Sequence, residues 1–300
     1  MGRSLLDIFR AARPIKIVPL WMLVGAGALI APSPVHGATL AIALAGIVGA
    51  SLAAMHINVV TDAELDAGTK PQLWAWMAAN EPAAKRVVCG EFVVAGLSVL
   101  WLATKCDFAV AGFVALYTAM GCLYSFNFLC PARPVQTRLK VSWWGHMVSM
   151  TAIYVSSWMA GLFSCEAFGW RVLARWGGPF LLATAADYAL FVAESAVDAP
   201  EERAARLNTL AAKLGRRGSQ CVAVVLAAVA CAGLVFLSES TTVRVALIPG
   251  ALLSLAVNTA LLRYDARLPA RLRQLLLEST FIGSRIYLIG ALLALSGACA

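Results

Sequence analysis

Two sets of three oxygen-bearing residues share the same four-residue spacing. The first set is Asn58, Asp62 and Asp66, and the second is Glu194, Asp198 and Glu202. In an α-helix, positions i, i+4 and i+8 lie nearly above one another, so each set would present a column of oxygens on one face. Mg²⁺ takes oxygen ligands and often bridges protein carboxylates to substrate phosphates. The repeated spacing therefore predicts a site for Mg²⁺ and a diphosphate.

The alternative interpretation is that ordinary solvated loops happen to be acidic at these positions. That explanation is adequate for a single carboxylate at the edge of a membrane. It is a poor one for two matched triads, because acids in or beside a membrane that face a cavity are usually functional.

The composition predicts the elements that must hold these residues. Of the 300 residues, 61% are hydrophobic and 13% are charged, which is typical of an all-α membrane protein. We expect one polytopic transmembrane domain over residues 1–300, with nine transmembrane helices around a central cavity. The nine apolar segments lie near residues 15–33, 38–60, 86–104, 108–130, 142–165, 177–196, 218–237, 243–262 and 280–299.

The basic residues predict the orientation in the membrane. Twenty of the 24 lysines and arginines fall on one side of the nine segments, and only Lys105, Arg171, Arg175 and Arg244 fall on the other. By the positive-inside rule, the N-terminus and the even-numbered connections are cytoplasmic and the C-terminus is outside. We expect an integral protein of a bacterial inner membrane, with membrane lipids as partners. The net charge of +8 reflects this topology, so nucleic-acid binding is not expected.

The second segment with its triad recurs in outline as the sixth segment with its triad. The offset between Asn58 and Glu194 is 136 residues. Halves of about 1–140 and 141–300 would each supply one wall of a shared cavity, as in other membrane proteins built from repeats.

These motifs resemble the UbiA superfamily of intramembrane prenyltransferases. The resemblance rests on the NxxxDxxxD pattern from Asn58, on the DxxxE pattern from Asp198 followed by Arg203, and on the run 209–215. It implies that Asp62, Asp66, Asp198 and Glu202 are the catalytic, metal-binding acids that hold Mg²⁺ against a prenyl diphosphate. Asn58 and Glu194 would assist in binding this substrate, with Glu194 at a position where the family often has Asn.

Within the superfamily, the chain is most similar to the chlorophyll and bacteriochlorophyll synthase branch. The shared features are Arg13-Pro14, Pro19-Leu20-Trp21, Tyr124-Ser125, Arg138-Leu139-Lys140 and the aromatic pattern from Trp143 to Gly161. Compared with that branch, this chain has about eight additional residues between Tyr124 and Arg138.

The chain departs from the family pattern beside the first motif. Ala63 stands where the family usually has Arg, and Leu73-Trp74 replaces an Arg-Pro pair. The remaining cations that could bind the diphosphate are Lys70, Arg138, Lys140 and Arg203. Arg206 replaces the Gly expected before Thr209.

The implied reaction is transfer of a polyprenyl group from its diphosphate to a lipophilic, aromatic or tetrapyrrole-like acceptor. Ionisation of the allylic C–O bond leaves a carbocation, which is stabilised by aromatic faces in a dry cavity. Candidates for this lining are Tyr124, Tyr154, Trp158 and Tyr188. Asp187 could extend the second column toward the acceptor, or be a buried acid bonded to a neighbouring hydroxyl. His146 could contact the acceptor, although a lone His at a membrane edge is more often structural.

Two other functions fit the same sequence. A UbiA-type terpene cyclase would use the same triads but fold the cation back onto its own double bonds, without an acceptor. A non-catalytic membrane protein that inherited the fold would explain the missing arginines around the first motif.

Overall fold

The regular structure of the chain is helical throughout its described part. A computed structural model describes residues 14–31, 33, 36–61, 81–125, 139–237 and 240–297. Its α-helices are α2 (Pro14–Ile30), α3 (Gly37–Thr61), α6 (Glu81–Lys105), α7 (Phe108–Ser125), α8 (Trp143–Phe163), α9 (Trp170–Ser195), α10 (Ala199–Ala204), α11 (Leu210–Phe236), α12 (Ile248–Tyr264) and α13 (Ala270–Gly297). Shorter turns are η2 (Leu139–Val141), η3 (Ala196–Asp198), the π-helical η4 (Val243–Leu247) and η5 (Asp265–Arg267).

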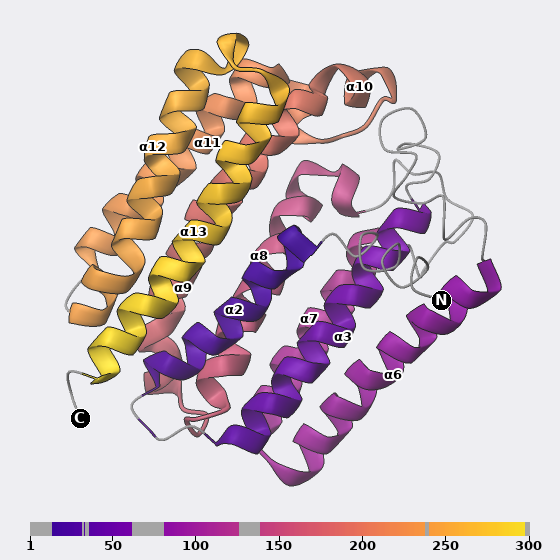
Figure 1. Cartoon of the computed structure of the whole chain (residues 1–300), viewed down its shortest axis with the longest axis vertical. Helices are drawn as coiled ribbons and strands as arrows, with labels where there is room; N and C mark the ends of the chain where they lie inside the picture. Colours follow the sequence, from indigo (N-terminus) through magenta and orange to yellow (C-terminus); the bar gives the residue numbers. More distant parts are fainter. Residues whose placement is uncertain are drawn as a thin grey trace.

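The helices form two groups joined by a central pair. Helices α3, α6 and α7 pack on one another, and α9, α11, α12 and α13 form the other group. Helices α2 and α8 lie between the two groups (Figure 1). Helix α2 packs mainly against α8 and α13, and α8 packs mainly against α2 and α7. The first helix of each sequence half is thus surrounded largely by helices of the other half.

In the described part of the chain, six helices are long and apolar enough to cross a membrane. They are Gly37–Asn58, Pro82–Lys105, Trp170–Ala204, Leu210–Phe236, Val243–Tyr264 and Ala270–Ser296. Two shorter apolar helices are Lys16–Ile30 and Phe108–Tyr124. Helix α8 falls in neither group and carries three serines and a threonine. Its part from Ser149 to Phe163 is largely buried among other helices, so it need not be apolar on every side. The nine-span count therefore stays a prediction, while the membrane-type helical fold is observed.

Several helices begin earlier than the hydrophobic segments predicted. Helix α9 begins at Trp170 rather than near 177, α11 at Leu210 rather than near 218, and α13 at Ala270 rather than near 280. The added turns contain polar and basic residues, which end a hydrophobic segment without ending a helix. Arg285 was counted with the cytoplasmic connections, but it lies inside α13 and is buried.

The contact between α2 and α8 brings two backbones together at glycine. A Cβ atom on Gly161 would stand 1.9 Å from the carbonyl oxygen of Val24, and one on Gly27 would stand 2.1 Å from the carbonyl oxygen of Trp158. Neither position has space for any side chain. Small residues of this kind let membrane helices approach closely, and van der Waals contact then holds them together.

The connection between α12 and α13 is fixed by an ion cluster. Arg216 of α11 and Arg273 of α13 both donate to the Asp265 carboxylate. Burial raises the pKa of the Asp265 carboxyl, but the hydrogen bonds from Arg216, Gln220 and Arg273 outweigh burial and hold the pKa below its ordinary value. This cluster places the first turn of α13 beside the second acidic motif.

Candidate functional site

A cavity of ≈ 650 Å³ lies where α3 and α9 end and where α2 and α8 begin. One end of the cavity is polar and holds the residues of both motifs that the structure describes. The other surfaces are aromatic and aliphatic, including Leu20, Tyr117, Met150 and Ile153. The volume falls within the range typical of small-molecule sites.

The first motif contributes Asn58, in the last turn of α3. The Lys140 ammonium, just before α8, donates to the Asn58 side-chain oxygen at 2.9 Å. Lys140 is largely buried, yet both residues line the cavity. Asp62, Asp66, Lys70 and Arg138 lie outside the described residues, so their predicted roles stay predictions.

The second motif is not a straight helical column. Glu194 lies in the last turn of α9, Asp198 ends the 3₁₀ turn η3, and Glu202 lies on the short helix α10. The expected four-residue stacking fails because the chain changes helix type twice between Glu194 and Glu202. All three acids nevertheless line the cavity, together with Glu201.

Thr209 fixes the position of Glu202. Its hydroxyl donates to the Glu202 carboxylate and accepts from the Ala212 N–H, at 3.0 Å, as the N-cap of α11. The Trp143 N–H also donates to the Asn208 carbonyl, at 2.9 Å, which ties this loop to the start of α8. The loop before α11 therefore holds Glu202 in place and joins it to the start of α8.

Arg203 and Arg206 do not line the cavity. The Arg203 guanidinium donates to the Ala212 carbonyl at 2.7 Å and lies beside Gly215, whose φ of +71° kinks α11. Arg203 is not among the cavity-lining residues, so a diphosphate-binding role for it gains no support. Arg206 has a φ of +54°, a conformation that favours glycine, which is the residue that the family resemblance led us to expect there.

Three rings form one aromatic wall of the cavity. The His146 ring lies 5.5 Å from each of the Tyr124 and Tyr188 rings, and His146 Nδ1 is 3.0 Å from the Tyr188 hydroxyl. Tyr154 and Trp158, also predicted as lining, are instead buried between helices, where Trp158 stacks on Phe180. Aromatic residues that face a cavity and aromatic residues of the core have the same spacing along a helix, so spacing alone does not distinguish them.

Asp187 forms a buried ion pair with Arg285. The two side chains are 7% and 6% exposed, and they join α9 to α13. Asp187 therefore has an arginine partner rather than a hydroxyl, and it is not among the cavity-lining residues. Its predicted role in acceptor binding gains no support from this placement.

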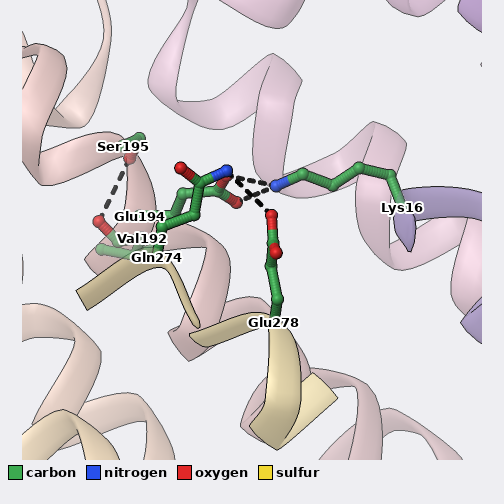
Figure 2. Close-up of polar contacts among 6 residues, drawn as sticks. All are labelled: Lys16, Val192, Glu194, Ser195, Gln274 and Glu278. Atoms are coloured by element: carbon green, nitrogen blue, oxygen red, sulfur yellow. Dashed lines mark hydrogen bonds and ion pairs between the residues drawn. The ribbon is translucent and has the colours of Figure 1, made fainter. Parts of the chain in front are cut away.

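Lys16 is a residue of the cavity that the sequence did not single out. Its ammonium contacts both carboxylate oxygens of Glu194, from the first turn of α2 to the last turn of α9 (Figure 2). The two residues are separated by 178 positions in the chain. Lys16 had been counted only as one of the basic residues that set the topology.

The donor chemistry of the polar end suits a hard cation. Its acidic lining consists of Glu194, Asp198, Glu201 and Glu202, which offer oxygen ligands only. Within the described ranges, no three His, Cys, Asp or Glu side chains gather closely enough to form a complete metal site. The described residues thus fit one side of a Mg²⁺ site, facing the wall from which Asn58 projects.

The fold and the cavity define a class: a helical membrane protein with acidic and basic residues at one end of a cavity lined by aromatic and aliphatic side chains. The UbiA prenyltransferase family matches residues 20–284 of the chain. The chain therefore belongs to that family. A comparison with curated proteins gives no match.

Solved structures share the fold at low sequence identity. A UbiA homolog from Archaeoglobus fulgidus bound to GPP and Mg²⁺ is 13% identical with a TM-score of 0.68, and the match covers 96% of this chain and 98% of that one. The apo UbiA homolog from Aeropyrum pernix K1 is 17% identical with a TM-score of 0.67, covering 93% and 97%. A structure of digeranylgeranylglyceryl phosphate synthase is 11% identical with a TM-score of 0.63, covering 97% and 98%.

Proposed function

We propose that this protein is a Mg²⁺-dependent intramembrane prenyltransferase that moves a prenyl group from its diphosphate to a lipophilic acceptor. The observation that carries the proposal is the cavity itself. It joins Asn58, Lys140 and the acids of the second motif at one end to the ring wall of Tyr124, His146 and Tyr188. Family membership and the GPP and Mg²⁺ bound by the Archaeoglobus relative support the same function.

The two ends of the cavity would have different roles in the reaction, one at the diphosphate and one at the allylic cation. Mg²⁺, held by Asp198 and Glu202 with Asp62 and Asp66, would supply positive charge at the departing diphosphate. Lys140, which donates to the Asn58 side-chain oxygen, would add positive charge at the same end of the cavity. The aromatic wall then faces the allylic cation with negative ring quadrupoles and excludes water that would capture the cation.

The acceptor is the least defined partner in this proposal. The likeness to the chlorophyll synthase branch favours an aromatic or tetrapyrrole-like molecule over a small soluble one. Comparing the lipids of cells with and without the protein by mass spectrometry would identify the prenylated product. A cyclised hydrocarbon formed without any added acceptor would favour the terpene cyclase instead.

Geranyl diphosphate is expected to bind the purified protein in the presence of Mg²⁺, and excess EDTA is expected to weaken this binding at least about a hundredfold. The reason is that the acidic lining repels an anionic ligand unless a cation intervenes. Isothermal titration in detergent or nanodiscs, with Mg²⁺ and with EDTA, measures both affinities. Undiminished affinity in EDTA would contradict the proposed metal site.

We also propose that the polar end of the cavity faces the cytoplasm. Nineteen of the 24 basic residues lie in the N-terminal segment and the even-numbered connections once Arg285 is removed from the predicted 20. In a cysteine-free background, Phe168→Cys between α8 and α9 should react with an impermeant maleimide added outside. Arg267→Cys in η5 should react only after permeabilisation. The reverse pattern would invert the proposed topology.

A further inference from the structure

Two lysines make similar contacts at the starts of α2 and α8. Lys16 lies at the start of α2 and contacts Glu194 at the end of α9, while Lys140 lies just before α8 and contacts Asn58 at the end of α3. Helices α2 and α8 begin their respective halves, and α3 and α9 follow them. Each lysine thus contacts the first residue of a triad, at the end of another helix.

The two contacts differ in charge. Asn58 is a neutral amide, so this contact does not cancel the positive charge of Lys140. Glu194 is a carboxylate and cancels the charge of Lys16. The described lining of the cavity contains these two lysines and four acids, so it is acidic on balance before any ligand enters.

The Lys16–Glu194 pair is partly exposed to the cavity, so a ligand that enters the cavity can reach it. The side chains are 20% and 35% exposed, and ion pairs with this much solvent contact are weak. Both residues line the main cavity and also a smaller one of ≈ 180 Å³ beside α13. Gln274 and Glu278 of α13 flank the pair and bond to each other at 2.8 Å (Figure 2).

A diphosphate entering the polar end is a stronger partner for Lys16 than Glu194 is. It carries more negative charge on more oxygens, and the lysine ammonium binds phosphate as a compact point charge on a flexible stem. This second lysine would also offset the arginines that are missing beside the first motif, at Ala63 and Leu73-Trp74.

We infer that Lys16 is a diphosphate-binding residue that Glu194 holds in reserve, and that it transfers from the carboxylate to the ligand when the ligand binds. This inference rests on the proposed function and extends it. Glu194 then acts as the resting partner of Lys16 rather than as a direct contact of the substrate.

The test is the affinity for geranyl diphosphate at saturating Mg²⁺, measured for single and double variants. Lys16→Met removes the cation and should weaken binding about tenfold or more, whereas Lys16→Arg should retain it. Glu194→Gln releases Lys16 and should tighten binding about threefold or more, because no ion pair has to open. Lys105→Met, at the exposed far end of α6, is the matched control and should bind like the unmodified protein.

The double variant separates the inference from a simple charge effect. If Glu194 acts through Lys16, Lys16→Met with Glu194→Gln should bind within about twofold of Lys16→Met alone. Equal tightening by Glu194→Gln in both backgrounds would overturn the inference, as would weaker binding in Glu194→Gln or unchanged binding in Lys16→Met. Should Lys16→Met not fold, Lys16→Gln replaces it in both the single and the double variant. An unmodified protein that binds no geranyl diphosphate would instead overturn the proposed function, and this inference with it.

Discussion

Asparagine in place of Asp198 is expected to lower turnover about a hundredfold or more while the fold stays intact, on the order of 3 kcal/mol of lost transition-state stabilisation. Asp198 lines the polar end of the cavity near Glu201 and Glu202. Removing one charge from a group of like charges relieves repulsion in the metal-free protein, so thermal stability should not fall. Diphosphate release and thermal unfolding should be measured together, with and without Mg²⁺.

The corresponding change in the first motif, Asp62→Asn, is expected to have the same effect. Glu166→Gln is the matched control, because Glu166 lies beyond the other end of α8, where it accepts from the Ser33 N–H, and glutamine keeps an acceptor oxygen. Full turnover in Asp198→Asn would refute its catalytic role. Loss of turnover that tracks loss of stability would indicate a structural one, as expected of a non-catalytic protein with an inherited fold.

The largest effect on stability is expected from Arg285→Met. Asp187 and Arg285 are almost fully buried, so removing the arginine leaves a carboxylate inside the helix bundle without its partner. Removing one partner of a buried ion pair typically lowers the free energy of unfolding by about 3–5 kcal/mol. Unfolding by heat or by increasing SDS measures the loss.

Replacing both partners should restore most of that stability. Asp187→Leu with Arg285→Met leaves an apolar contact of similar volume, which is often no less stable than a buried ion pair. Arg271→Met, on an exposed face of the same helix, should change the free energy of unfolding by no more than about 0.5 kcal/mol. A double variant as unstable as Arg285→Met would show that the pair is not the reason for the loss.

Hydrophobicity predicts where the membrane helices lie better than it predicts where they end. The segments predicted near 38–60 and 243–262 agree with α3 and with η4 plus α12. The early starts of α9, α11 and α13 were missed because polar and basic turns extend these helices beyond their apolar parts. Helix α8 contains polar residues within its length and is still a helix, because two of its serines donate to carbonyls of the preceding turn, as Ser149 does to Gly145 at 2.7 Å.

Spacing along the chain predicts neighbours within one turn of a helix but not contacts between helices. The second triad could be read from its spacing, and Glu194, Asp198 and Glu202 do meet at the cavity. Lys16 could not be found in this way, because its partner lies 178 residues away on another helix. Arg285 was missed for the same reason, and Asp187 was consequently given a role in acceptor binding.

The glycine contact between α2 and α8 also has a consequence for biogenesis. Helix α2 is synthesised before α3, α6 and α7, yet the surface around Gly27 is covered by α8, which is made only after residues 31–142. During translation this surface of α2 therefore lacks its final partner until α8 has been made. Lys16 gains its partner later still, because Glu194 lies on α9 and is synthesised after α8. The cavity is thus assembled late, when the second half of the chain closes around a helix that entered the membrane first.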